Sequence, residues 1–161
     1  MDIEIGLKGQ VREEVGRVLN KLLADEHVLY IKTRNYHWNV VGPKFRTLHE
    51  FFEEQYKLLA PMIDEIAERA RSVGVLAAGS MAEFAREARL SEESGHPDAD
   101  TMIANLLADH ERVVVQLRKD IERVEDELED VGTADFLTGL MQQHEEQAWM
   151  LRAHLEEPHR A

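Results

Sequence analysis

Four long stretches of the chain repeat apolar residues at steps of three and four, and this periodicity constrains the fold more than any other feature. The first stretch covers residues 9–39 and the second covers residues 44–72, with Gly42-Pro43 between them as a break. The third stretch covers residues 98–130 and the last covers residues 134–155. Each stretch has one apolar face, as an amphipathic helix of a bundle requires.

The connections between these helices indicate the type of bundle. Residues 73–97 form the one long connection, and Met81–Ala88 is expected to form a short helix within it. A single long crossover among short loops is the ferritin-like connection pattern. We therefore predict an all-α, ferritin-like four-helix bundle with a short extra helix in the crossover between helices two and three. Residues 1–161 are expected to form a single domain.

Two positions within this pattern are expected to be irregular. Pro61 lies inside the second stretch, where it removes a backbone hydrogen bond at a cost of about 3 kcal/mol, so a kink or a break is predicted there. Gly132-Thr133 is expected to separate the last two helices, with Thr133 as the N-cap of a helix that begins at Ala134.

The composition argues against several classes of protein. The chain has no cysteine, which excludes disulfides and thiolate metal sites and favours a cytoplasmic location. It has no run of about 18 apolar residues, so no membrane span is expected, and no signal peptide is apparent at the N-terminus. The net charge of −13 disfavours contact with nucleic-acid phosphates and attracts cations.

A set of histidines and carboxylates suggests a metal site. His37 and His49 stand on either side of the Gly-Pro break, so a helical hairpin would bring them close together. Asp64 and Glu68 are one helical turn apart. If His49 is set at 0° on a helical wheel, three acidic residues lie within about 100° of it, namely Glu53, Asp64 and Glu68. The four residues of the second helix therefore share one sector, beside its apolar stripe.

Distance prevents a single chain from completing this site. His49 and Asp64 are about 22 Å apart along a helix, so one metal ion cannot contact both in the same chain. An antiparallel pairing with a second copy would create two equivalent sites per dimer. Two imidazoles with carboxylates suit Fe(II), Mn(II) or Zn(II) better than Cu(I). The alternative is a purely structural helical oligomer whose histidines bind nothing.

The segment NYHWNVVGPKFRTLHEFFEEQYKLL, followed by MIDEIAERARSVG, resembles the signature of Dps-type mini-ferritins, and TADFLTGLMQQHEEQAWMLRAHL resembles the last helix of that family. The resemblance implies a hollow homododecamer that oxidises Fe(II), preferably with hydrogen peroxide, and stores ferric mineral. The alternative it implies is a DNA-binding, nucleoid-protecting protein with secondary iron chemistry. Binding to DNA is not expected, because neither end of the chain is rich in lysine and arginine.

The resemblance also implies roles for individual residues. The ferroxidase site would take His37 and His49 from one subunit and Asp64 and Glu68 from its partner. Glu53 stands where many family members have an aspartate ligand. Iron is the implied metal, although Zn(II) or Mn(II) could occupy the site. The other implied groups are pore acids (Asp126, Asp130, Asp135), nucleation acids (Glu50, Glu53, Glu54) and radical-quenching tryptophans (Trp38, Trp149), whereas structural or surface roles are expected for His27, His110, His144 and His154.

Overall fold

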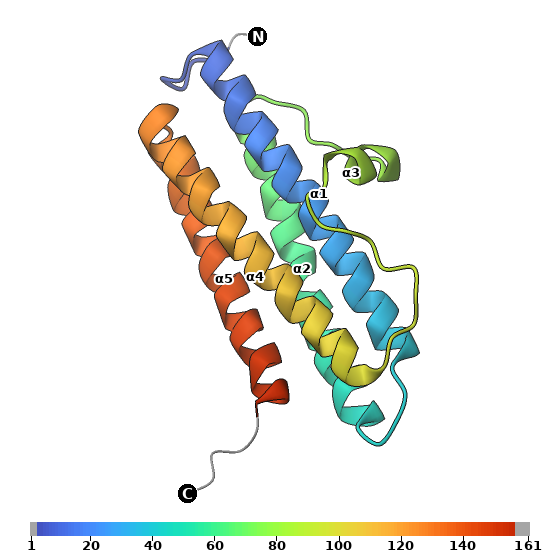
Figure 1. The fold of residues 1–161 in the computed structure, drawn as a ribbon. Coiled ribbons are helices and arrows are strands. Elements are labelled where there is room, and N and C mark those ends of the chain that lie inside the picture. Colours follow the sequence, from blue (N-terminus) through green and yellow to red (C-terminus); the bar gives the residue numbers. More distant parts are fainter. Residues whose placement is uncertain (1–2, 157–161) are drawn as a thin grey trace, which may run out of the picture.

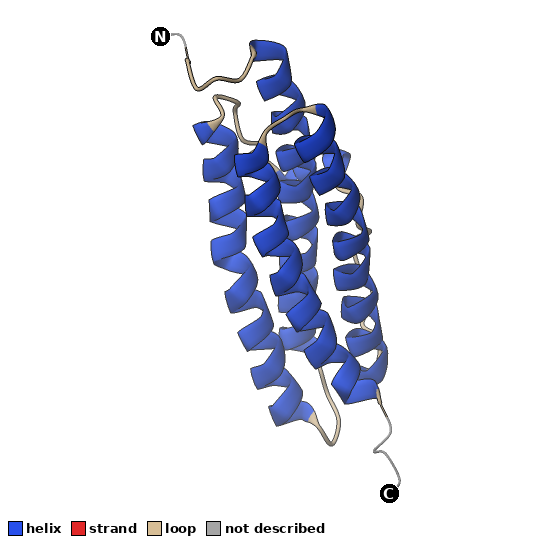
Figure 2. Cartoon of the chain, turned by 90° about the vertical axis from the view of Figure 1, so that its left-hand side faces the viewer, coloured by secondary structure: helices blue, strands red, loops and turns tan. Residues whose placement is uncertain are grey.

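The computed structural model describes residues 3–156, and every regular element in this part of the chain is a helix. Four long helices lie side by side and form a bundle (Figure 1, Figure 2). They are α1 (Gly9–Asn39), α2 (Phe45–Ser72), α4 (Ala99–Glu122) and α5 (Val131–Leu155). The predicted all-α bundle is confirmed. None of these helices is both long and apolar enough to cross a membrane.

The remaining elements lie in the crossover and at the end of α4. The short helix α3 (Met81–Glu87) was predicted, and it packs on α1 in the crossover between α2 and α4 (Figure 1). Ser80 and Glu83 form a capping box at its start. A π-helical turn, η1 (Arg123–Glu127), follows α4 directly and widens the helix before the acidic turn into α5.

The core lies along the axis of the bundle and is apolar over most of its length. Each long helix contributes large side chains that are at most 1% exposed, such as Leu22, Phe52, Leu106 and Leu140. Burying one such side chain stabilises the fold by about 1.5–3 kcal/mol. Because the same residues define the three- and four-residue steps of the sequence, the periodicity predicted the core faces correctly.

The crossover is fastened to α1 and α4 by a buried charge network. The carboxylate of Asp25 accepts hydrogen bonds from the backbone N–H groups of Arg89 and Leu90, at 2.5 and 3.1 Å. The Arg89 guanidinium lies between Asp25 and Asp120, at 2.7 and 2.8 Å. This network joins three segments that are far apart in the sequence, and it holds the crossover along the outside of α1.

Of the kink or break predicted at Pro61, the break is wrong, because α2 is a single helix from Phe45 to Ser72. Pro61 cannot donate a hydrogen bond to the carbonyl of Lys57. Both residues are exposed, so water can reach that carbonyl. The buried side chains of Leu59 and Met62 lie on either side of Pro61 and pack the helix against the core.

The predicted start of the last helix is also wrong, because α5 begins at Val131. The N-cap is Asp130, whose carboxylate accepts hydrogen bonds from the N–H of Thr133 at 3.0 Å and from its hydroxyl at 2.5 Å. Arg69 of α2 lies 3.4 Å from the same carboxylate. Thr133 is therefore inside the first turn and supports the cap from there.

Candidate metal centre

Two histidine rings are stacked where α1 ends and α2 begins. His37 lies in the last turn of α1 and His49 in the second turn of α2. The chain reverses between them at Gly42, whose φ of 112° favours glycine. The ring centroids are 3.9 Å apart and the ring planes meet at 20°. The sequence predicted this proximity, and the hairpin produces it.

Each ring is held by the backbone of the other histidine. The Nδ1 atom of His37 is 2.7 Å from the carbonyl oxygen of His49, and the Nδ1 atom of His49 is 2.8 Å from the carbonyl oxygen of His37. A carbonyl oxygen can only accept, so each Nδ1 carries the proton and donates it. In the neutral ring with this tautomer, Nε2 carries the free lone pair that binds a metal ion.

The groups around the pair come from both helices. The ring of Tyr56 meets the ring of His37 edge-on, with centroids 5.3 Å apart. Phe45 packs beside His49 at 5.3 Å. His37 is only 8% exposed, so the pair is sheltered from water on the side of the bundle. A sheltered site of this kind strengthens electrostatic attraction to a bound cation.

Glu53 follows His49 by one helical turn on α2, and its carboxylate forms an ion pair. Its Oε1 atom is 2.5 Å from the Nζ atom of Lys57. The hydrogen bond and the charge of Lys57 lower the pKa of Glu53. Glu53 is therefore a carboxylate at the edge of the histidine pair, engaged by a lysine.

Asp64 and Glu68 lie further along α2 and are exposed. Because α2 is unbroken, the helical rise keeps Asp64 about 22 Å from His49 along the axis. Among residues 3–156, no three histidine, aspartate or glutamate side chains lie together in a way that could hold a metal ion. One chain thus brings together the two histidines, and it leaves the two carboxylates apart from them.

The remaining predicted site residues are spread over the surface. Trp38 and Trp149 are 60% and 63% exposed, so neither is a core aromatic. The guanidinium carbon of Arg34 lies 4.8 Å from the centre of the Trp38 ring. Glu50 pairs with Arg46 at 3.1 Å, and Glu54 is exposed.

The predicted pore acids differ from one another in their surroundings. Asp126 and Asp135 are exposed. Asp130 is only 5% exposed, and its carboxylate is engaged by Thr133 and Arg69. Asp130 therefore has a structural role as a helix cap. The burial of its side chain distinguishes Asp130 from Asp126 and Asp135.

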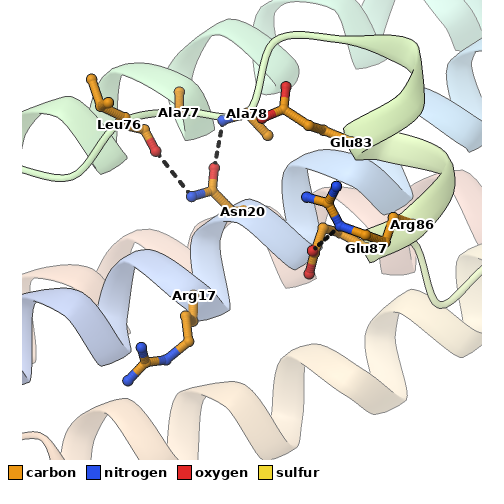
Figure 3. Close-up of a pocket in the computed structure, with 8 residues that line it drawn as sticks. All are labelled: Arg17, Asn20, Leu76, Ala77, Ala78, Glu83, Arg86 and Glu87. Carbon is orange, nitrogen blue, oxygen red and sulfur yellow. Dashed lines mark hydrogen bonds and ion pairs between the residues drawn. The ribbon is translucent and has the colours of Figure 1, made fainter.

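A polar pocket of about 210 Å³ lies toward the other end of α1, against the crossover (Figure 3). Asn20 donates a hydrogen bond to the carbonyl of Leu76 at 3.0 Å and accepts one from the N–H of Ala78 at 2.8 Å. Asn20 and His37 are about 25 Å apart along α1. The pocket belongs to the anchoring of the crossover and takes no part in the histidine site.

Sequence reasoning missed two neighbours of the histidine pair. The sequence predicted no role for Lys57 or for Tyr56. The spacing of Glu53 and Lys57, four residues apart on one helix, was the available signal for their ion pair. The contact of Tyr56 with His37 depends on how α1 and α2 pack, which the spacing does not specify.

Comparison with known proteins identifies the family. The family model described as Ferritin-like domain matches residues 17–161. A low temperature-induced protein of Nostoc sp. (strain PCC 7120) is 51% identical over 155 residues, which cover 96% of this chain and 87% of that protein. DNA protection during starvation protein 2 of Bacillus anthracis is 40% identical, with 90% of this chain and 99% of that protein covered. The chain is a Dps-type mini-ferritin.

Solved structures agree with this membership. A crystal structure of a Dps protein from Vibrio cholerae O1 matches the mini-ferritin with a TM-score of 0.90 and 31% identity, over 97% of this chain and 98% of that one. That protein is described as a member of a broad superfamily of ferritin-like diiron-carboxylate proteins. Membership supports iron storage or DNA protection at the level of the family.

Proposed function

We propose that this mini-ferritin is a ferroxidase that oxidises Fe(II) at sites shared between two subunits and stores the ferric product. The observation that carries the proposal is the stacked pair of His37 and His49, whose Nδ1 donors are both bound to backbone carbonyls. The two rings are stacked, their Nε2 atoms are not used by these hydrogen bonds, and residues 3–156 of one chain leave the set of ligands incomplete.

A second copy would complete the set through its own α2. In an antiparallel arrangement, the register that puts His49 opposite Glu68 of the partner subunit also puts Glu53 opposite Asp64 of the partner subunit. The same register puts Lys57 opposite Ala60 of the partner subunit, near the two-fold axis. Ala60 is exposed, and its small side chain lets the two helices approach closely. Two equivalent sites per dimer follow from the symmetry.

The proposed ligands suit the oxidation of iron. Carboxylates bind Fe(III) more strongly than Fe(II), because oxygen ligands favour the harder and more highly charged ion. Oxidation is therefore favoured at a site that combines the imidazoles of His37 and His49 with the carboxylates of Asp64 and Glu68 from the partner subunit. Two Fe(II) ions each lose one electron, and one hydrogen peroxide takes both electrons with two protons and becomes two waters.

The other proposed roles concern the assembled cage, which we propose to be a cytoplasmic homododecamer. Asp126 and Asp135 are exposed and could line an entry pore for Fe(II), where copies from several subunits would attract cations. Asp130 would support that pore by capping α5. The exposed Glu50 and Glu54 remain candidates for mineral nucleation, and the exposed Trp38 and Trp149 for radical quenching.

Two inactive variants test whether the sites are shared. His37→Ala/His49→Ala and Asp64→Ala/Glu68→Ala should each lose fast Fe(II) oxidation, measured by stopped-flow absorbance with peroxide and with oxygen. After the two are dissociated, mixed equally and reassembled, half of the dimers should be mixed. Each mixed dimer would hold one complete site, so about a quarter of the wild-type activity should return.

The outcome against the proposal is equally specific. If mixed dimers form, as native mass spectrometry of two differently tagged variants would show, and no activity returns, the carboxylates are not shared with the partner. His96→Ala is the matched control, because His96 is an exposed histidine outside the pair. That variant should oxidise Fe(II) at the wild-type rate.

A second candidate function is DNA protection, which is favoured by the names of relatives such as the Bacillus anthracis protein. The groove between α1 and α4 carries Arg17, Lys21, Lys119 and Arg123. However, Glu14 pairs with both arginines, and the chain as a whole carries −13. We therefore expect no gel shift of DNA without magnesium at moderate salt. A metal-free shift that Lys21→Glu/Lys119→Glu abolishes would favour DNA protection.

A further inference from the structure

The ion pair between Glu53 and Lys57 lies at the edge of the histidine site, and the proposed function gives it no role. The two side chains are one helical turn apart on α2, with Oε1 and Nζ 2.5 Å apart. Glu53 also follows His49 by one turn of the same helix, so its carboxylate lies on the same face as the imidazole of His49. Glu53 therefore faces two kinds of partner, the ammonium group of Lys57 and whatever cation the histidines bind.

These two partners cannot use the carboxylate equally. A metal ion that takes Glu53 as a ligand has to displace the ammonium group, or share the carboxylate with it. Even when displaced, the ammonium remains a positive charge tethered one turn away, and it repels a second cation. The histidines do not have to give up a partner in this way. Their hydrogen bonds use Nδ1, so Nε2 is left for a metal ion.

We propose that Lys57 makes the two metal positions of each ferroxidase site unequal. The first position uses His37, His49 and the partner's carboxylates. The second position lies on the side of Glu53, and it fills only when Glu53 gives up Lys57. Lys57 is thus a positioning residue that acts through Glu53, and this inference rests on the proposed function.

The proposed dimer strengthens this effect. The register derived above puts Lys57 opposite Ala60 of the partner subunit, close to the two-fold axis. In the free subunit Lys57 is 64% exposed, so water screens its pair with Glu53. A partner helix would exclude much of that water, and charges interact more strongly in such surroundings. The lysine would therefore discriminate against the second metal ion most strongly in the assembled protein.

Anaerobic titration of the assembled protein with Zn(II), followed by calorimetry, tests the proposal without any redox chemistry. The wild type should show one tight site per subunit and a second, weaker one. Lys57→Gln removes the charge and should strengthen the second site about threefold to tenfold, with the first nearly unchanged. Lys57→Arg keeps the charge and should resemble the wild type. Lys21→Gln is the matched control, because Lys21 is an exposed lysine on another helix.

The variants separate this inference from the proposed function. Glu53→Gln should abolish the second site and leave the first one. Equal second-site affinities in the wild type and Lys57→Gln would overturn the role of Lys57, while tight binding that needs His37 and His49 would still support the ferroxidase. Unchanged binding in His37→Ala/His49→Ala would overturn both. Native mass spectrometry of each variant should show the wild-type assembly, which excludes an indirect loss through dissociation.

Discussion

Two pairs of histidines are in contact within residues 3–156 of the mini-ferritin, and they are built in opposite ways. The pair between α1 and α2, His37 and His49, donates both Nδ1 protons to backbone carbonyls. The pair between α4 and α5, His110 and His144, has its two Nδ1 atoms 2.9 Å from each other, and its ring centroids are 5.1 Å apart. The first pair keeps both Nε2 atoms available. In the second pair, the two Nδ1 atoms face each other, and Nε2 of His144 faces the carboxylate of Glu26.

The core pair also includes a carboxylate from a third helix. The Nε2 atom of His144 lies 2.7 Å from Oε1 of Glu26, and Glu26, His110 and His144 are all 0% exposed. This 2.7 Å contact is not an aligned hydrogen bond, and neither atom has a hydrogen-bond partner within residues 3–156. Histidine therefore serves two purposes in this bundle. In the pair of His37 and His49, hydrogen bonds to the backbone leave Nε2 open as a metal ligand. In the pair of His110 and His144, contacts with other side chains give the histidines a structural role.

The largest effect that would test this contrast is expected in the core. Glu26→Ala leaves the buried His144 without the carboxylate that faces it and leaves a cavity in the core, and truncating a large buried side chain to alanine costs about 2–5 kcal/mol. We expect a loss of that size in the free energy of unfolding, measured by chemical denaturation of the metal-free protein. The assembled fraction should still bind Zn(II) at His37 and His49.

The control for this variant is Glu92→Ala, because Glu92 is exposed in the crossover. Its free energy of unfolding should stay within about 0.5 kcal/mol of the wild type. If Glu26→Ala abolished Zn(II) binding in a protein that remained folded and assembled, the core group would be a metal site, and the contrast between the two pairs would be lost.

The second expected effect is a dependence of stability on pH that comes from the core pair. Burial, and secondly the neighbour His144, hold the pKa of His110 well below its ordinary value of 6.5. In the unfolded chain His110 takes up a proton below pH 6.5, and in the folded chain it does not. The free energy of unfolding should thus fall as the pH drops below 6.5, by up to about 1.4 kcal/mol per pH unit. Above pH 6.5 this residue contributes no slope.

His144 from α5 faces His110, and Glu26 from α1 faces His144 in turn, with the buried and uncharged Gln147 three residues further along α5. The pKa of His154 is also lowered by burial, so the measurement is best made in a His154→Gln background. Denaturation between pH 5 and 7 should show a steeper slope for the parent than for His110→Leu. Equal slopes would mean that the core pair does not control stability in this range.

Local signals in the sequence were sufficient for most of the fold. The first helix was predicted at residues 9–39, and α1 covers Gly9–Asn39, because apolar periodicity and the Gly-Pro break are local features. The break at Pro61 was wrong, since the packing of Leu59 and Met62 outweighs the lost hydrogen bond. The start of α5 was wrong because Asp130 caps the helix with support from Arg69 on α2, a contact that no local pattern contains.

The candidate site, like the fold, was predictable from local sequence signals only in part. The hairpin was enough to predict that His37 and His49 meet, and the helical rise was enough to separate Asp64 from them. The backbone partners of each Nδ1 atom depend on the geometry of the loop at Gly42, which spacing does not determine. His110 and His144, for which structural or surface roles were expected, are fully buried in the core. Their contact with Glu26 is formed between three helices, so it could not be predicted.

The smallest expected effect concerns the stability contribution of the open pair. His49→Ala removes one hydrogen bond to the carbonyl of His37 and the stacking of the two rings. A typical intramolecular hydrogen bond contributes about 0.5–1.5 kcal/mol. We therefore expect a loss of about 1 kcal/mol in the free energy of unfolding of the metal-free protein, against several times that value for Glu26→Ala. Zn(II) should stabilise the wild type and leave His49→Ala almost unchanged, because a ligand raises stability only in a chain that binds it. A loss of 3 kcal/mol or more without metal, again judged on the scale of single hydrogen bonds, would mean that this pair holds the fold together as the core pair does.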